Sequence, residues 1–427
     1  MKKIGKHKLY LGNCLKVLRK IEDNSIDSIV TDPPYGLKFM AKKWDHDVPQ
    51  VDVWKECLRV LKPGGYLLAF AGTRTQHRMA VNIEDAGFAI VDMIAWCYAS
   101  GFPKSLNISK AIDAKLLHGG SSSKQIKLAN ASRPGKGRER KSTTTNGVMG
   151  ASTGGKVTND NPATEQAAKW KGFGTAIKPA IEPITLARKP LEGTYVDNVL
   201  KYGVGGLNID GCRIPHVTVA GGNLAQNSHL RGTINGGNGG RIISKEDKRR
   251  VVIPNQIGRF PANFIHDGSE EVRHAFPNAP GQQGDLSGHS KDRKSKGCYG
   301  DMKSARDHVK RVETDKSAAR FFYVAKASKK DRDEGNTHIT VKPRQLMRYL
   351  VRLVTPIGGT CLDPYMGSGT TLVACEEEGC YKGVGIELLK EHFKICKMRV
   401  RKARRLNVRK AEAVKAVKKK KKVKHGR

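Results

Sequence analysis

The 427-residue chain is long enough for two or three domains, or for one domain with large insertions. Its 78 Lys and Arg residues against 40 Asp and Glu give a formal charge of +38, which favours a polyanion such as a nucleic acid as partner. The nine cysteines include no Cys-x-x-Cys pair, which argues against a zinc site and a disulfide scaffold. No run of about 18 apolar residues and no signal-peptide pattern occurs, so we expect an intracellular protein without a membrane partner.

Near the start, an apolar run is followed directly by two prolines. The run at residues 26–30 predicts a buried strand, and Pro33 and Pro34 end it because neither can donate to a sheet ladder. Asp32 and Tyr35 then lie in a stiff turn at the carboxyl end of the strand, where open α/β sheets place their chemistry. A carboxylate and a backbone carbonyl there can accept both hydrogens of an amino group while a tyrosine ring stacks on a flat substrate. An ordinary strand-ending turn is the alternative.

Helices and strands alternate in the next part of the chain. A helix over residues 54–61 is expected to end at Lys62-Pro63-Gly64-Gly65, before a second buried strand at 66–70. A helix over 79–86 and a third strand over 88–97 follow, which predicts a largely parallel sheet with covered faces. The loop between Gly36 and Asp45 interleaves basic and aromatic side chains, which can either close over a nucleic acid or simply pack.

The middle of the chain loses this regular alternation. Residues 105–172 are rich in Gly, Ser, Thr and Lys without hydrophobic periodicity, which predicts a basic flexible insertion. A strand at 182–187 then returns to the sheet. Residues 190–316 combine Gly, Asn and Arg with a few isolated apolar clusters, which predicts a loop-rich module whose residue types can read base edges.

The C-terminal part carries a second strand and turn with chemical features. An amphipathic helix over 346–353 precedes a strand at 360–363, a Gly-Ser-Gly turn and another helix. A further strand ends at Glu387, where such folds present a carboxylate to ribose hydroxyls. A phosphate-binding loop would require a lysine after Gly369, and a nicotinamide fold would leave the turn at residues 32–35 without a role. The lysine run at 418–422 predicts a disordered basic tail.

Residues 32–35 (Asp-Pro-Pro-Tyr) and 363–370 (Asp-Pro-Tyr-Met-Gly-Ser-Gly-Thr) together resemble the motifs of the amino-group DNA methyltransferases. The order of the motifs is similar to the β-class, including its phage and prophage members. This resemblance implies an α/β, Rossmann-like, S-adenosylmethionine-dependent methyltransferase sheet that is circularly permuted, with an inserted recognition region. It divides the chain into catalytic halves at 1–104 and 317–405, the basic flexible insertion at 105–172, a returning core strand at 173–189, a target-recognition region at 190–316 and a basic disordered tail at 406–427.

The resemblance also implies a function. It is site-specific transfer of methyl from S-adenosyl-L-methionine to the exocyclic amine of a flipped base in double-stranded DNA, with adenine N6 preferred because Asp-Pro-Pro-Tyr is commoner in that branch. Cytosine N4 methylation is the first alternative, followed by RNA or protein amide methylation and by noncatalytic DNA binding. A cognate restriction endonuclease and a second copy of the chain are candidate partners, and the expected location is the cytoplasm of a prokaryotic or phage-infected cell.

The site residues follow from the motifs of the resembled family. Those implied as catalytic are Asp32, Pro33, Pro34 and Tyr35. Those implied as cofactor-binding are Asn13, Lys342, Asp363, Pro364, Tyr365, Gly367, Ser368, Gly369, Thr370 and Glu387. The base pocket or the DNA would be contacted by Phe39, Trp44 and Phe102, and no metal is expected.

Overall fold

The structure is a computed structural model, and it divides the chain into two compact units. The first comprises Met1–Cys212, Ala262–Val272 and Val324–Arg427, and the second comprises Arg213–Pro261 and Arg273–Tyr323. The structure describes residues 1–37, 46–101, 105–131, 138–139, 157–158, 161–214, 258–279, 294–297, 300–303, 317–326, 328, 331–333, 335–338 and 340–424.

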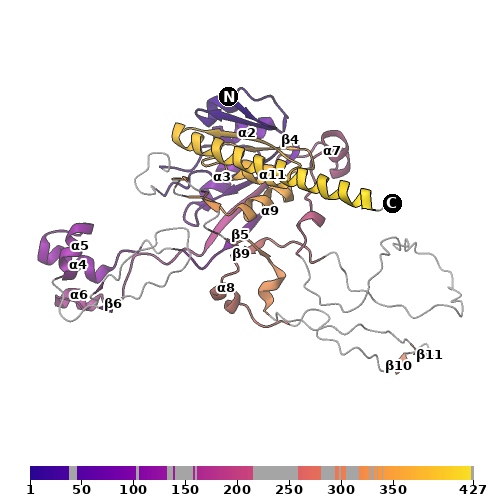
Figure 1. The fold of residues 1–427 in the computed structure, drawn as a ribbon. Coiled ribbons are helices and arrows are strands. Elements are labelled where there is room, and N and C mark those ends of the chain that lie inside the picture. Colours follow the sequence, from indigo (N-terminus) through magenta and orange to yellow (C-terminus); the bar gives the residue numbers. More distant parts are fainter. Residues whose placement is uncertain are drawn as a thin grey trace. The chain divides into compact units, whose positions relative to one another are not determined.

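A ten-stranded sheet organises the first unit (Figure 1). Its strands lie in the order β1 (Lys2–Ile4), β2 (His7–Leu11), β14 (Lys382–Glu387), β13 (Thr360–Asp363), β3 (Ile26–Thr31), β4 (Leu61–Phe70), β8 (Ile181–Arg188), β5 (Ala89–Cys97), β9 (Phe264–His266) and β12 (Tyr323–Val324). The strands from β2 to β4 are parallel, and β8 pairs antiparallel with both β4 and β5. The two ends of the sequence thus contribute interleaved strands to one sheet, as the order of the two motifs predicts.

Helices cover both faces of this sheet. Helices α1 (Cys14–Leu18), α2 (Val51–Val60) and α3 (Gln76–Asp85) belong to a core with Val384 and Ile386 of β14. The alternate residues of that strand, Gly383 and Gly385, face the other way, because an added Cβ on either would meet Leu372 at 3.0 and 2.9 Å. Leu372 lies on α10 (Thr370–Glu378), which packs with α9 (Arg344–Val354) and α11 (Lys390–Lys424). The two glycines therefore let this second helical layer approach the sheet.

The structure differs from expectation at the Pro-Gly-Gly segment. Strand β4 begins at Leu61, so Lys62–Gly65 belongs to the strand instead of separating helix from strand. The pairing of β3 with β4 shifts register between Ile26 and Ser28, and this irregularity accommodates Pro63, which cannot donate to the ladder.

The described parts of residues 105–172 also differ from the expected flexible insertion. They contain α4 (Ile108–His118), α5 (Ser123–Ala131) and α6 (Glu165–Lys169), and α4 packs against both of the others. The buried carboxylate of Asp113 accepts hydrogen bonds from the backbone N–H groups of Ala163 and Thr164 and from the Thr164 hydroxyl, at 2.7 to 3.1 Å. A buried acid of α4 thus holds the residues that begin α6, a contact that composition alone does not reveal.

The expected boundaries of the recognition region and of the tail also shift. Helix α7 (Tyr195–Tyr202) contacts β4, and β9 joins the sheet, so both belong to the first unit. The second unit contains the Ile214–Arg259 bridge and the ring contact between Phe276 and Phe322, with centroids 5.5 Å apart. The expected tail is helical as far as Lys424. Among the described residues, no helix has the length and apolarity needed to span a membrane.

Candidate active site

Two turns leave the sheet side by side at the carboxyl ends of neighbouring parallel strands. Ile29 of β3 pairs with Leu362 of β13, so Thr31 and Asp363 end their strands at the same edge. The Thr31 hydroxyl donates a hydrogen bond of 2.7 Å to Asp363 Oδ1. The Asp-Pro-Pro-Tyr turn and the glycine-rich turn are therefore held together directly, although 332 residues separate the bonded pair in sequence.

A cluster of four side chains, which we call the acceptor cluster, lies at the first of these turns and consists of Asp32, Tyr35, Glu182 and Lys342. The Tyr35 hydroxyl donates to Asp32 Oδ1 at 2.7 Å, with Glu182 Oε2 at 3.2 Å. The Lys342 ammonium lies 2.9 Å from Asp32 Oδ2, 2.9 Å from Glu182 Oε2 and 2.9 Å from the Tyr35 hydroxyl oxygen. On the far side of Glu182, the Tyr98 hydroxyl donates to Oε1 at 3.3 Å. One ammonium thus lies among three oxygen acceptors, two of which are carboxylates.

The charges of this acceptor cluster fix its protonation. Burial raises the pKa of Tyr35 well above its usual value, and the two carboxylates raise it further, so the phenol stays neutral and donates. Burial alone would lower the pKa of Lys342, but Asp32 and Glu182 outweigh it and raise that pKa above its usual value. The cation also lies 4.9 Å from the centroid of the Phe70 ring. Two carboxylates, one cation and one phenol therefore leave the acceptor cluster with a net negative charge.

At the second turn, Asp363 shapes the backbone. Its carboxylate, which is 3% exposed, accepts from Thr31, from Thr371 Oγ1 at 2.5 Å and from the backbone N–H of Tyr365 at 3.1 Å. Burial raises its pKa to about 6, against the effect of these hydrogen bonds, and the charge of Asp32 acts in the same direction as burial. With both oxygens engaged by the protein, Asp363 fixes the conformation of the turn.

The glycines of this turn are required by the backbone and by its neighbours. Gly367 has φ of 50° and Gly369 has φ of 80°, both in the region that favours glycine. A Cβ on Gly367 would lie 2.9 Å from His338 Nε2, and one on Gly369 would overlap Cys396 Sγ. Both residues therefore let the turn pack closely against its neighbours.

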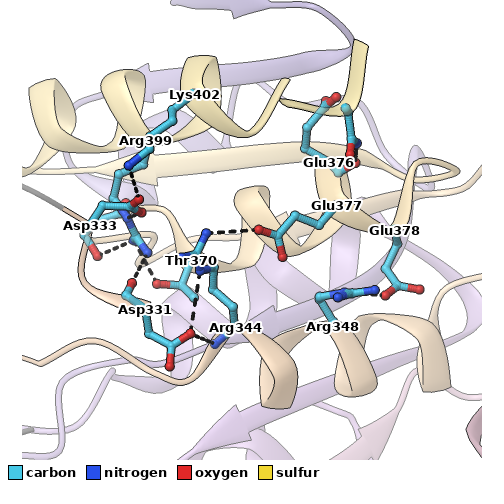
Figure 2. Close-up of polar contacts among 12 residues, drawn as sticks. Asp331, Asp333, Arg344, Arg348, Thr370, Glu376, Glu377, Glu378, Arg399 and Lys402 are labelled. Carbon is cyan, nitrogen blue, oxygen red and sulfur yellow. Dashed lines mark hydrogen bonds and ion pairs between the residues drawn. The ribbon is translucent and has the colours of Figure 1, made fainter. Parts of the chain in front are cut away.

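A buried arginine ties the glycine turn to a segment before α9. Arg399 of α11 is 1% exposed and donates to the Ser368 carbonyl at 2.8 Å, to Ser368 Oγ at 2.9 Å and to Thr370 Oγ1 at 3.0 Å. It also donates to the carbonyl of Asp331 at 2.7 Å and pairs with the carboxylate of Asp333 at 3.1 Å, as Figure 2 shows. The burial lowers the pKa of Arg399, and Asp333 opposes that effect. This arginine thereby connects three chain segments around the site.

Acidic and histidine side chains lie around the glycine turn. Glu387 ends β14 and accepts from the backbone N–H of Leu389 through Oε1 at 2.7 Å, while its Oε2 makes no hydrogen bond within the described part of the chain. The His338 ring lies 4.3 Å from the His392 ring, and its Nδ1 donates to the Thr340 carbonyl at 2.5 Å. Burial, helped by His392, lowers the pKa of His338 to about 4, so the ring is neutral near pH 7.

The structure brings most of the predicted site residues to this one edge. Lys342, which is predicted to bind the cofactor, contacts Asp32 of the first turn and Glu182 of β8. Asn13 caps α1 by accepting from the backbone N–H of Lys16 at 3.2 Å, next to the end of β14. The predicted base-pocket residues, Phe39, Trp44 and Phe102, lie outside the described residues. Across the residues that are described, no group of three or more His, Cys, Asp or Glu side chains could hold a metal ion.

Sequence reasoning missed three residues of the site. Glu182 comes from the returning antiparallel strand, Tyr98 follows β5, and Arg399 lies on the last helix. The signal that could have found Glu182 is a single acid at the start of an apolar strand expected in the same sheet. Arg399 is one of many cations in a basic helix, and its sequence context does not distinguish it from exposed neighbours.

Comparison with known proteins identifies a matching family model and several similar methyltransferases. The family model described as DNA methylase matches residues 26–189 and 270–398. The type II methyltransferase M.HpaI of Haemophilus parainfluenzae is 31% identical over 118 residues, which cover 26% of this chain and 38% of that protein. M.HindIII of Haemophilus influenzae is 23% identical over 244 residues, covering 47% of this chain and 64% of that protein. The chain thus spans less than two thirds of the length of these curated relatives.

Among solved structures, the DNA modification methylase TTHA0409 of Thermus thermophilus is similar at 16% identity, with a TM-score of 0.38 and coverage of 93% of this chain and 95% of that one. The family model covers more than half of the 427 residues, including both turns of the site. The chain therefore belongs to the DNA methylase family.

Proposed function

We propose that this protein transfers a methyl group from S-adenosyl-L-methionine to the exocyclic amine of a base in duplex DNA, and that the base is adenine, methylated at N6. The observation that carries the proposal is the juxtaposition of the two turns, joined by the Thr31–Asp363 hydrogen bond. Membership of the DNA methylase family supports DNA as the substrate. Bacterial relatives support action on chromosomal DNA, in the cytoplasm.

The acceptor cluster around Asp32 is suited to an amine. An exocyclic amine is a poor nucleophile because its lone pair is shared with the ring. Acceptors that hold both of its hydrogens favour tetrahedral nitrogen and free the lone pair, which is stabilisation of the transition state by preorganised dipoles. The Lys342 ammonium already donates to Asp32, Glu182 and Tyr35, so these oxygens converge on one N–H donor. We assign Asp32 and the Pro33 carbonyl as the acceptors for the target amine.

The transfer needs no covalent enzyme intermediate. The target amine would attack the electrophilic methyl group that the bound cofactor supplies, with the thioether as leaving group, and Asp32 would take the proton that the nitrogen loses and pass it to solvent. Tyr35, whose hydroxyl is tethered to Asp32, would present its ring to the flipped base, an interaction worth roughly 1 to 3 kcal/mol. Stacking and phosphate contacts together offset the few kcal/mol needed to flip the base.

The residues of the second turn fit an adenosyl ligand. When bound, S-adenosyl-L-methionine supplies an electrophilic methyl group on its sulfonium. Gly367, Ser368 and Gly369 offer backbone at the carboxyl end of β13, while Asp363, Pro364, Tyr365 and Thr370 complete the turn. Glu387 ends the next strand with Oε2 available to a ribose hydroxyl, and Asn13 lies beside it. The test is calorimetric titration with this cofactor, with Gly367→Val as the variant expected not to bind.

The activity test uses labelled cofactor with duplex DNA, RNA or a protein extract, followed by mass spectrometry of the product. Label in DNA as N6-methyladenine is the expected result. Label in DNA as N4-methylcytosine would change the proposed target base from adenine to cytosine. Label in RNA or protein alone would overturn the proposal. Sequencing DNA from expressing cells with modification-sensitive reads would then identify the recognition sequence. Because the relatives are named type II methyltransferases, a restriction endonuclease that cuts the same sequence is the partner to seek.

Replacing Asp32 by Ala tests the chemistry itself. We expect the variant to bind cofactor and DNA but to lose about 10² to 10³ in turnover, the usual cost of removing one preorganised partner of a developing charge. Lys342 keeps Glu182 as a counter-ion in this variant, so the fold should be retained. Wild-type turnover would remove Asp32 from the mechanism.

A further inference from the structure

A strongly basic groove lies between β1 and the middle of α11, residues 401–412. It has a volume of about 650 Å³, and its lining includes the cationic residues Lys2, Lys3, Arg401, Arg404, Arg405 and Arg409. One carboxylate, Glu412, also lines it. Figure 1 shows the N-terminal strand and α11 near each other in the first unit. We refer to this feature as the α11 groove.

The six cations of the α11 groove are exposed and outnumber its one carboxylate. Within the described part of the chain none of the six forms an ion pair, whereas Arg399 and Lys402 of the same helix both pair with Asp333. Six like charges around one concave surface repel each other, and a concave basic surface concentrates counter-ions. The surface is therefore suited to a ligand that carries several negative charges.

The α11 groove is separate from the candidate active site. Strand β2 begins at His7, beside the β1 hairpin, and ends at Leu11, which pairs with Glu387 at the catalytic edge. Lys6, in the hairpin turn, donates to the carbonyl of Gly379 at the end of α10 away from the glycine turn. The groove thus extends from the level of Leu9, with which Lys2 pairs, toward the ends of the strands opposite the two turns, and none of its lining residues belongs to either turn.

The shape of the basic surface favours an extended polyanion. Helix α11 continues to Lys424, so from Arg401 onward it spans about 35 Å at 1.5 Å per residue, the length of about ten base pairs. The groove lining contains Ile4 and Val408 as its only large apolar residues among those described, which provides little of the apolar anchor that a protein partner uses. Phosphates at regular spacing match this composition better than an acidic peptide.

We propose that the α11 groove binds the phosphate backbone of duplex DNA outside the target site, as a second and sequence-independent contact. The inference rests on the proposed function, because it takes duplex DNA as the substrate. Through this contact, a long duplex would be held more tightly than a short one, and the protein would stay on DNA between target sites.

The test compares two variants that each lose four positive charges. In the groove variant, Lys2, Lys3, Arg405 and Arg409 are replaced by Gln. In the control variant, Arg19, Lys20, Lys55 and Lys382, which are exposed and lie outside the groove, are replaced by Gln. Fluorescence polarisation over a salt series measures the affinity of each full-length protein for a duplex of about 12 base pairs carrying the target and for one of about 60 base pairs. Methylation of the short duplex reports the catalytic site.

The groove variant should bind the long duplex at least about tenfold more weakly, with a slope of log affinity against log salt reduced in magnitude by about 3. Its binding and methylation of the short duplex should match the control. Equal slopes for the two variants on the long duplex would overturn the proposal, as would equal losses on the short and long duplexes. Absence of methylation in all proteins, with the binding difference intact, would contradict only the proposed function.

Discussion

At the scale of single residues, the Lys342 ammonium controls how strongly Asp32 can accept. Its charge is shared between Asp32 and Glu182, each at 2.9 Å, and the Tyr98 hydroxyl supports Glu182 from the other side. If Glu182 were neutral, the Lys342 ammonium would interact more strongly with Asp32. Asp32 would then accept hydrogen bonds from an incoming amine less well. Glu182 is therefore a positioning residue for the proposed transfer.

Replacing Glu182 by Gln should lower the rate of methyl transfer by about tenfold or more, since it removes a charged partner of Lys342. Tyr98→Phe is the matched control, because it removes a neutral hydrogen bond worth about 0.5 to 1.5 kcal/mol from the same carboxylate. Single-turnover rates at saturating DNA and cofactor separate chemistry from binding. A Gln variant as fast as the control would show that Glu182 does not influence Asp32.

His338 makes the stability of the protein depend on pH. Its pKa is lowered to about 4, first by burial and then by His392, while the Thr340 carbonyl, Glu387 and Asp32 oppose the shift. A group whose folded pKa lies below its unfolded value of about 6.5 stabilises the fold above that value and loses the contribution as pH falls toward 4. Acid should therefore destabilise the protein through this ring, by at most about 3 kcal/mol.

In the His338→Gln variant, we expect this part of the pH dependence to disappear. Denaturant unfolding at pH 7, 6, 5 and 4 would measure the free energy of unfolding for both proteins. The raised pKa of Asp363 acts in the opposite direction, losing stability as pH rises through about 6, but it is present in both proteins and cancels in the difference. A constant difference across the series would contradict the shifted pKa of His338.

Some residues of the site could be predicted from the sequence and others could not. The turns at 32–35 and 363–370 are contiguous, so their prolines and glycines reveal them directly. Glu182 and Arg399 reach the site from segments whose local sequence is ordinary, and only strand pairing and helix packing bring them there. For the same reason the contacts of Lys342 with Asp32 and Glu182 could not be predicted, since these two carboxylates come from distant parts of the sequence.

At the scale of elements, α11 has two functions along its length. Its first half packs on the sheet through Phe393, Cys396 and Val400, and it delivers Arg399 to the glycine turn. Its middle, residues 401–412, lines the basic groove. Composition predicted a disordered tail from residue 406, because lysine runs bury nothing, but helix continues where the ordered first half provides the nucleus.

The contact of Arg399 with the glycine turn predicts unequal effects for two cations that share Asp333. Arg399→Met leaves Asp333 without its buried partner and should cost about 3 to 5 kcal/mol of stability, together with affinity for cofactor. Lys402→Gln removes the other partner of the same carboxylate, but Lys402 is 55% exposed, so the cost should stay below about 1 kcal/mol. Arg399→Lys, which keeps the charge but not the forked geometry, should retain the fold and still bind cofactor more weakly.

Chemical denaturation and calorimetric titration of cofactor would measure the two effects on the same samples. The positioning role of Arg399 would be supported if Arg399→Met lowered both stability and cofactor affinity. It also requires that Arg399→Lys lower only the cofactor affinity. Equal effects of Arg399→Met and Lys402→Gln would contradict it.

At the scale of the whole molecule, the sheet interleaves the two ends of the sequence. Strands β2 and β3 are close in sequence, yet β14 and β13, from the last quarter of the chain, lie between them. Motif order was enough to predict this permutation, because the two halves of a methyltransferase sheet are recognisable on their own. The helical order within 105–172 was not predictable in the same way, because it depends on a buried acid, Asp113, contacting residues 50 positions away.

This interleaving predicts that neither end of the chain folds alone. A fragment ending at Tyr323 would lack β13 and β14, which leaves open strand edges on both β2 and β3 and exposes apolar residues such as Ile29. We expect this fragment to show no cooperative thermal unfolding transition, and co-expression with residues 324–427 to restore one, because the second fragment supplies the central strands. Circular dichroism melts of the fragments, alone and combined, would measure this. A chain ending at Glu412 is the control, since it keeps every strand and should melt within a few degrees of the full chain. A cooperative transition in the isolated N-terminal fragment would contradict the dependence of the sheet on its C-terminal strands.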